Sequence, residues 1–418
     1  MWDELRLQGE FDRDLKLLLC EMFSRRIVMG FLEVVRAIYF ALIGLSPLAI
    51  GMLITVGTVF SAFESFIFGP LSDRYGRKLF LILGGVFSTI RLVLYAVSRD
   101  FWILAVAQGI GALGEGVGSG QPVVSGYIAD KTRAAKRAHV FSVLAISNSV
   151  SSTIGALTAA LPAYFQASLG VDVVESHVFL FWVGVAMNVL AMFLLIPLRD
   201  VERQRKEGSV KPASTFSWRE LGKYCVIRST DGLAFGLISP LSSLFFYLRF
   251  GATSADLAPI YAIARFVPVF VYFLVPVFVN RFGDVKGLAV TRIASCGVVL
   301  ALGFASDFAS AAFFFVAYRG IVEFAMPMRQ AFASGIVEPS QTGAIIGMSS
   351  SLRSLIQAAA PTVAGYLFGV SLFTVPLFAG AVLLAVNGVQ YRVFYGGRKS
   401  GNAGSTSVAG GSDGTSVC

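Results

Sequence analysis

The residues most able to do chemistry in this chain are charged side chains that stand inside long apolar stretches. Placing such a charge at the centre of a bilayer costs about 2.5–3.5 kcal/mol, so each one must pair with an opposite charge or face water. Carboxylates in these places are able to carry protons, because burial disfavours their charged form. Arginines in these places either neutralise the acids or suit an anionic solute. The charges of this kind that we take as candidates are Glu33, Arg36, Arg91, Glu115, Asp231, Arg265, Arg319 and Glu323.

Spacing along the chain places some of these charges on shared helix faces. Glu33 and Arg36 are three residues apart, and so are Arg228 and Asp231. Residues three or four apart are neighbours on the surface of a helix. At a rise of about 1.5 Å per residue, Arg36 falls roughly 13–15 Å into the first apolar stretch, which is near the middle of a bilayer.

The elements that must position these charges are the apolar stretches themselves. Of the 418 residues, 56% are hydrophobic and 14% are charged, against roughly 25% charged in soluble domains. A helix crosses a bilayer with about 20 apolar residues, whereas a barrel strand needs about 9–11 that alternate with polar ones. The sequence therefore predicts an all-α integral membrane protein with about twelve transmembrane helices. The expected spans are 27–45, 48–68, 79–97, 101–124, 138–162, 178–198, 224–248, 257–279, 287–305, 308–335, 343–368 and 372–394.

The formal net charge of +9 is distributed unevenly between the loops. Basic residues gather in alternate loops, within 74–78, 131–137 and 199–223, while the opposite loops hold little beyond Arg99 and Arg249. Loops rich in Lys and Arg stay in the cytoplasm. We therefore expect both termini to be cytoplasmic, and we expect no nucleic-acid partner.

A hydrophilic segment divides the chain into two halves that resemble each other. The halves match at an offset of about 207 residues, so that Gly44 maps onto Gly251 and Gly76 onto Gly283. This repeat predicts two pseudo-symmetric six-helix bundles. The expected divisions are a cytoplasmic N-terminal segment (1–21), an N-terminal bundle (22–198), a cytoplasmic linker (199–222), a C-terminal bundle (223–395) and a disordered cytoplasmic tail (396–418).

A charged, glycine-bounded loop joins the second and third expected spans. Residues 69–78 read Gly-Pro-Leu-Ser-Asp-Arg-Tyr-Gly-Arg-Lys. This loop resembles the signature Gly-x-Leu-(Ser/Ala)-Asp-Arg-x-Gly-Arg-(Lys/Arg) of major facilitator superfamily (MFS) transporters. The glycine-rich run from Gln108 to Gly114 resembles the fourth span of that family, although Ala105 stands where the family often has an arginine. Residues 329–361 resemble an uncharacterised prokaryotic-type branch.

The resemblance implies a gate on the cytoplasmic side. Asp73 would meet the start of the eleventh span near residues 342–343, and Arg77 would pair with an acid after the fourth span, for which Asp130 is the candidate. The residues assigned to this gating motif are Gly69, Asp73, Arg74, Gly76, Arg77, Lys78, Asp130 and Arg137.

The resemblance also implies roles for the intramembrane charges, because spans 1, 4, 7 and 10 line the central cavity in this family. We expect a structural role for Glu64, Arg228 and Arg329, which lie nearer the inner surface. We expect Glu33, Arg36, Glu115, Arg319 and Glu323 to face the cavity. Glu33 and Glu115 are the first candidates for a proton carrier, and Asp231 and Glu323 come next. Whether the arginines bind an anionic solute or only neutralise the acids remains open.

The function implied is secondary active transport of a small solute by alternating access, with protons as the expected coupling ion. We expect a monomer in the plasma membrane. Within transport, the sequence leaves open whether the protein takes up a small metabolite or exports drug-like, amphipathic compounds. A non-transporting receptor or a lipid-modifying membrane enzyme is a further alternative. The four cysteines and two histidines are scattered, so we expect no metal, no cofactor and no enzymatic activity.

Overall fold

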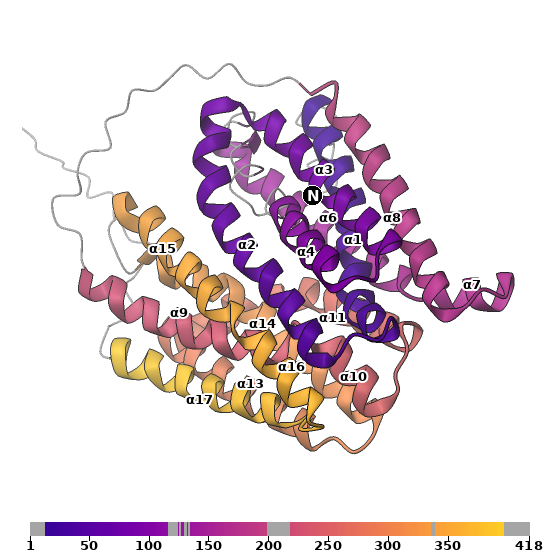
Figure 1. The fold of residues 1–418 in the computed structure, drawn as a ribbon. Coiled ribbons are helices and arrows are strands. Elements are labelled where there is room, and N and C mark those ends of the chain that lie inside the picture. Colours follow the sequence, from indigo (N-terminus) through magenta and orange to yellow (C-terminus); the bar gives the residue numbers. More distant parts are fainter. Residues whose placement is uncertain are drawn as a thin grey trace, which may run out of the picture.

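The computed structural model describes residues 13–115, 124, 127–128, 132, 134–198, 218–335 and 339–396. Helices account for all the regular structure in these ranges (Figure 1). The elements are α1 (Arg13–Leu42), α2 (Pro47–Tyr75), α3 (Arg77–Val97), α4 (Phe101–Glu115), α6 (Ala134–Thr158), α7 (Leu161–Leu169), α8 (Val173–Leu195), α9 (Trp218–Ile238), α10 (Ser242–Phe250), α11 (Ser254–Val271), η1 (Tyr272–Leu274), α12 (Val275–Phe282), α13 (Asp284–Phe304), α14 (Phe308–Gly335), α15 (Pro339–Ala358), α16 (Ala360–Gly369) and α17 (Val375–Tyr395).

A helix or a broken helix occupies each of the twelve expected spans. In the described part of the chain, eight helical segments are long and apolar enough to cross a membrane, and 47–63 and 101–114 are shorter apolar helices. Several spans are broken, because a proline near the start of α7, α12 and α16 prevents the preceding helix from continuing. The predicted all-helical membrane fold is confirmed.

The helices pair in the same way in two successive halves, α1–α8 and α9–α17. In the first half α1 packs against α6 and α8, α3 packs against α4 and α8, and α2 packs against α4. In the second half α9 packs against α15 and α17, α13 against α14 and α17, and α11 against α14. If the spans of each half are numbered one to six in chain order, both halves pair span 1 with spans 5 and 6, span 3 with spans 4 and 6, and span 2 with span 4. The two predicted pseudo-symmetric bundles are therefore present.

Backbone conformation supports the same repeat. Gly44 and Gly251, which the offset matches, have φ of 90° and 66°. Gly76 and Gly283, the second matched pair, have φ of 94° and 72°. Glycine adopts positive φ without the steric penalty that other residues meet. The chain therefore turns with the same geometry at corresponding points of each half.

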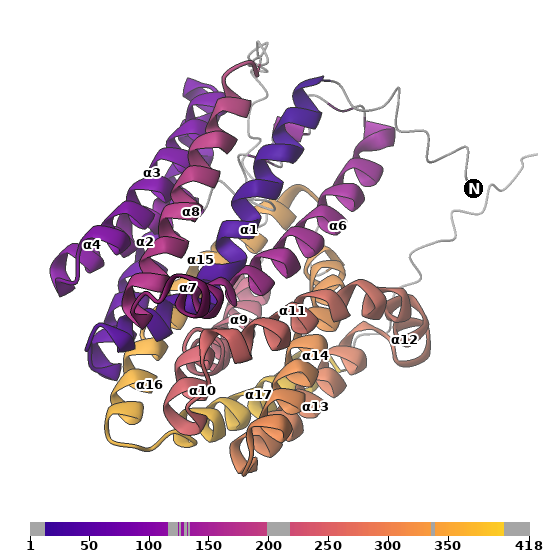
Figure 2. The same ribbon diagram turned by 90° about the vertical axis from the view of Figure 1, so that its right-hand side faces the viewer.

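The two halves contact each other at one end of the molecule. Near the start of α2, the Thr55 hydroxyl donates to the Ala358 carbonyl at 2.7 Å and lies 2.7 Å from the Thr362 hydroxyl. His177 and Ser254, near the starts of α8 and α11, are 3.3 Å apart. In Figure 1, α2 and α16 lie side by side at this end, and the ribbons of the halves diverge towards the starts of α1 and α6 (Figure 2).

The buried apolar residues follow the same division. The largest cluster contains residues of both halves, such as Phe31 and Ile54 from one and Phe245 and Phe315 from the other. Towards the opposite end there are two separate clusters, one in each half. Among the described residues, burial of apolar surface therefore joins the halves towards one end. We call this joined end the sealed end.

Candidate functional site

Glu33 links the two halves about two-thirds of the way along α1. Its carboxylate pairs with Arg265 of α11 and lies 3.5 Å from Nη2 of Arg319 on α14. Its side chain is 31% exposed, whereas that of Arg319 is buried. Three charged side chains predicted from the sequence are thus brought together across the boundary between the halves. We call Glu33, Arg265 and Arg319 the bridging triad.

Arg36 lies one turn further along α1 and has a different partner. Its Nη1 contacts Oε1 of Gln108 on α4 at 3.5 Å. Gln108 is buried, and its Nε2 has no hydrogen-bond partner. Glu33 and Arg36 therefore share a helix face but make their polar contacts with different helices. Gln108 was noted only as part of a glycine-rich motif, because an uncharged polar residue gives a weaker signal in an apolar run.

Asp231 is the centre of an ionic cluster inside the second half. Its Oδ1 lies 2.7 Å from Arg292 Nη2. Its Oδ2 lies 3.0 Å from Arg329 Nη1, 3.2 Å from Arg353 Nε and 3.4 Å from Arg228 Nη1. The contributing helices are α9, α13, α14 and α15, so the cluster ties four elements of this half together. We call it the Asp231 cluster.

The predicted pair of Arg228 and Asp231 is present, and Arg329, which the sequence also indicates as an intramembrane charge, contacts Asp231 as well. Arg292 is not among the candidates predicted from the sequence, although it stands within the expected span 287–305. Applying the intramembrane-charge criterion to every span would have found it. That these arginines converge on one acid follows from helix packing, which no local pattern reveals.

The remaining candidates are dispersed. Glu323 accepts a hydrogen bond from the Tyr272 hydroxyl at 3.3 Å. Arg91 is buried within the first half, with Nη2 3.4 Å from Met29 Sδ. A Cβ on Gly111 would collide with the Arg91 side chain, so the glycine leaves room for it.

Part of the gating motif is described. Arg77 is buried at the first turn of α3, and Lys78 Nζ donates to the Ile196 carbonyl at 2.6 Å. Arg74 lies 5.5 Å from the centre of the Tyr75 ring. The other candidates lie outside the described residues, either wholly or in their side chains: Glu64, Gly69, Asp73, Glu115, Asp130 and Arg137. The predicted contacts of Asp73 and of Arg77 with Asp130 therefore stay predictions.

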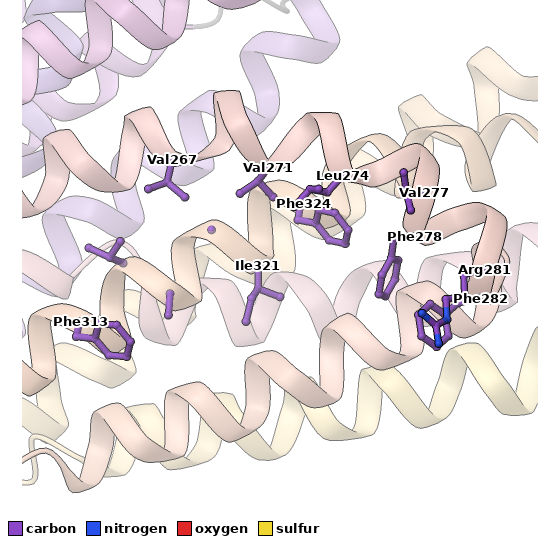
Figure 3. A pocket seen from close by; sticks show the side chains of 13 residues that line it. Val267, Val271, Leu274, Val277, Phe278, Arg281, Phe282, Phe313, Ile321 and Phe324 are labelled. Carbon is purple, nitrogen blue, oxygen red and sulfur yellow. The ribbon is translucent and has the colours of Figure 1, made fainter.

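An apolar groove of ≈ 610 Å³ lies apart from these charges, between α11–α12 and α14. Figure 3 shows Val271, Phe313 and Phe324 among the side chains that line it, with Arg281 at one end. Phe313 and Val277, which line opposite ends of the groove (Figure 3), are largely exposed, so the groove opens at the surface of the second half. None of the members of the bridging triad or of the Asp231 cluster lines it.

The chain is similar to known proteins over most of its length. The family model of the Major Facilitator Superfamily matches residues 17–321. Multidrug resistance protein 2 of Bacillus subtilis (strain 168) is 24% identical over 383 residues, which are 88% of this chain and 92% of that protein. Quinolone resistance protein NorA of Staphylococcus aureus (strain COL) is 25% identical over 352 residues, which are 82% of this chain and 86% of that protein.

The fold is also that of solved structures. One is a bacterial homolog of the human lysosomal transporter Spinster in an inward-facing and occupied conformation. The superposition has a TM-score of 0.73 at 16% sequence identity, and it covers 91% of this chain and 95% of the bacterial homolog. The family match, the pairing of the helices and the apolar spans agree. The chain belongs to the major facilitator superfamily and is a multi-pass membrane transporter of that family.

Proposed function

We propose that this transporter moves a small solute by alternating access, driven by the proton gradient across the cell membrane, and that it acts as a monomer. The proposed bundles are 22–198 and 223–395, joined by a cytoplasmic linker, with both termini in the cytoplasm. The junction of α2 and α3, which carries Arg74, Arg77 and Lys78, lies at the end where the ribbons diverge (Figure 1), and loops rich in Lys and Arg face the cytoplasm. On this assignment the sealed end is extracellular, and the conformation is open to the inside.

The observation that carries the proposal is the bridging triad. Any movement that separates the halves at mid-membrane must break the contacts of Glu33 with Arg265 and Arg319. Protonation of Glu33 removes the negative charge that holds both arginines. Partly exposed ion pairs contribute about 0.2–1 kcal/mol, which is small enough to be broken and remade in each cycle. Proton binding at Glu33 would thereby be coupled to the movement of the halves.

The test uses purified protein in liposomes with an imposed pH gradient. The radiolabelled solutes are a matched panel of 2-naphthoate, 2-naphthamide and 2-naphthylmethylamine. Glu33→Gln keeps the shape of the side chain and removes its titration. We expect gradient-driven accumulation to fall at least about tenfold, the change that a loss of 1.4 kcal/mol in coupling produces. Exchange of solute without a gradient should continue.

The matched control is Glu175→Gln, because Glu175 is an exposed acid in the first turn of α8. This variant should accumulate solute as the unmodified protein does. Undiminished accumulation in Glu33→Gln would remove Glu33 as the coupling group. If none of the three compounds is exchanged or accumulated, the panel gives no support for transport of small solutes.

A second candidate function is efflux of drug-like compounds. It is favoured by the similarity to Multidrug resistance protein 2 and to NorA, whose names record resistance. The test is expression in a bacterial host whose own efflux pumps have been deleted. Efflux predicts a rise in the minimal inhibitory concentration of several unrelated drugs, and a rise that Glu33→Gln removes. Unchanged drug sensitivity would favour uptake of a metabolite.

A further inference from the structure

The Asp231 cluster holds more positive than negative charge. Four guanidinium groups contact one carboxylate. In the described part of the second half, no acid besides Asp231 forms an ion pair with these arginines: Glu323 contacts Tyr272, Glu220 pairs with Lys223, Asp256 contacts Thr253 and Asp307 contacts Ser310. A purely structural cluster inside a membrane would be expected to balance its charges, because each unbalanced charge is costly there.

The donors of the cluster are also in excess. A guanidinium carries five N–H groups, and a carboxylate accepts about four hydrogen bonds. Within the part of the chain that the structure describes, the Nε atoms of Arg292 and Arg329 are buried without a hydrogen-bond partner. Arg329 Nη2 has only the sulfur of Met326, at 2.7 Å, and a thioether is a weak acceptor. The cluster therefore lacks acceptor oxygens as well as negative charge.

Two members of the cluster are accessible. The side chains of Arg228 and Arg353 are 16% and 19% exposed, whereas that of Asp231 is 5% exposed. Arg353 stands five residues before Ala358, the α15 residue that bonds to Thr55, so it lies about 7.5 Å from the sealed contact along the helix axis. It lies towards the end where the halves diverge. Since an arginine facing lipid tails is costly, we expect the exposed parts of these two side chains to face water between the halves.

The rest of the cluster orients this accessible pair. Asp231 Oδ2 accepts from Arg228 and Arg353, and the buried Arg329 and Arg292 contact the same carboxylate through Oδ2 and Oδ1. The Arg353 guanidinium also lies 5.2 Å from the centre of the Phe235 ring, a favourable cation–π distance. Preorganised guanidinium groups bind carboxylates and phosphates through paired, charge-assisted hydrogen bonds.

We propose that Arg228 and Arg353 bind the oxyanion of the transported solute, with Asp231 as the group that positions them, and that the solutes are small organic anions bearing a carboxylate or a phosphate-type group. This inference rests on the proposed transport function and names its substrate class. Phe235, beside Arg353, offers an apolar surface for the organic part of the solute.

The test measures thermal unfolding of the purified protein in detergent with the naphthalene panel, extended by 2-naphthylphosphonate. We expect the carboxylate or the phosphonate to raise the unfolding temperature in a saturable way, and the amide and the amine to leave it unchanged. The relative effect of the two anions distinguishes a carboxylate site from a phosphate site. Arg353→Gln and Arg228→Gln should each raise the half-saturating anion concentration roughly ten- to hundredfold, the effect of one lost charge-assisted hydrogen bond.

The control is Arg392→Gln, which removes one positive charge at an exposed position near the end of α17. It should bind the anions like the unmodified protein. Arg353→Lys keeps the charge and loses the planar fork, so it should bind with intermediate affinity. If Arg353→Gln does not fold, Arg228→Gln and Arg353→Lys carry the test.

Three results would overturn the inference: stabilisation by the amine or amide equal to that by the anions, anion binding unaffected in both glutamine variants, or no stabilisation by either anion. The liposome assay separates these failures from failure of the transport proposal. Accumulation of the amine without the carboxylate would refute the anion site and leave transport standing. Anion binding that requires Arg353, with no flux of any compound, would support the site and refute the transport proposal.

Discussion

Asp231 holds together a group of side chains that would repel one another without it. Its two oxygens contact guanidinium groups from α9, α13, α14 and α15. Removing one partner of a buried ionic group leaves the remaining charges uncompensated, which is strongly destabilising. The same carboxylate therefore serves stability and, on our proposal, the orientation of Arg228 and Arg353.

We expect Asp231→Asn to lower the stability of the protein by about 3–5 kcal/mol, because the arginines then face one another without a counter-charge. The measurement is thermal unfolding in detergent. Asp284→Asn, in the first turn of α13, is the control and should unfold near the original temperature. Adding Arg329→Gln to Asp231→Asn should recover part of the loss, since it removes one of the unbalanced charges. An unchanged unfolding temperature in Asp231→Asn would show that the cluster contributes no net stability.

Which residues carry intramembrane charge was predictable from the sequence, but their partners were not. Glu33 and Arg228 stand out because acids and arginines are rare in apolar runs. The i, i+3 spacing correctly joined Arg228 to Asp231. The partners of Glu33 are on α11 and α14, far along the chain. Such contacts depend on how the two halves dock, and no local spacing contains that information.

At the scale of elements, the contact between α2 and α16 depends on small residues. A Cβ on Gly51 would meet the Pro361 carbonyl and the Thr362 Cα, and a Cβ on Gly365 would meet the Pro47 carbonyl. Glycine at such positions lets helix backbones approach closely. The sequence predicted both spans, but it predicted residues 343–368 as one continuous helix. The structure divides this span into α15 and α16. Pro361 was the local signal for that break.

We expect Gly51→Val to separate α2 from α16 and to open the sealed end. The readout is labelling of a cysteine placed at Thr55 by a membrane-impermeant maleimide, in protein whose four native cysteines are replaced by serine. The labelling rate should rise at least about tenfold, which corresponds to a shift of 1.4 kcal/mol in the opening equilibrium. Gly297→Val is the control, because a Cβ at Gly297 meets nothing within 4 Å. Equal labelling in both variants would contradict a seal built on this contact.

At the scale of the whole molecule, the two halves share one core at the sealed end and keep separate cores at the other. The sequence predicted the twelve spans from local hydropathy and the repeat from matched glycines, and both signals can be recognised without knowing the tertiary structure. It did not indicate which end is joined. Rigid halves that rock about a central site keep their internal pairs in every state, so the pattern within each half is compatible with either arrangement.

The geometry of the sealed end allows it to be locked by a disulfide bond. The hydroxyl oxygens of Thr55 and Thr362 are 2.7 Å apart, so sulfurs in their places would lie close to the disulfide bond length of about 2.05 Å. Thr55→Cys with Thr362→Cys, in the protein without native cysteines, should form a disulfide on oxidation. If the seal must open in each cycle, solute exchange in liposomes should fall to the level of empty liposomes and return on reduction. Oxidised Thr55→Cys alone should retain full exchange. Full exchange by a demonstrably cross-linked double variant would show that transport proceeds without opening this end, because the disulfide holds α2 and α16 together throughout.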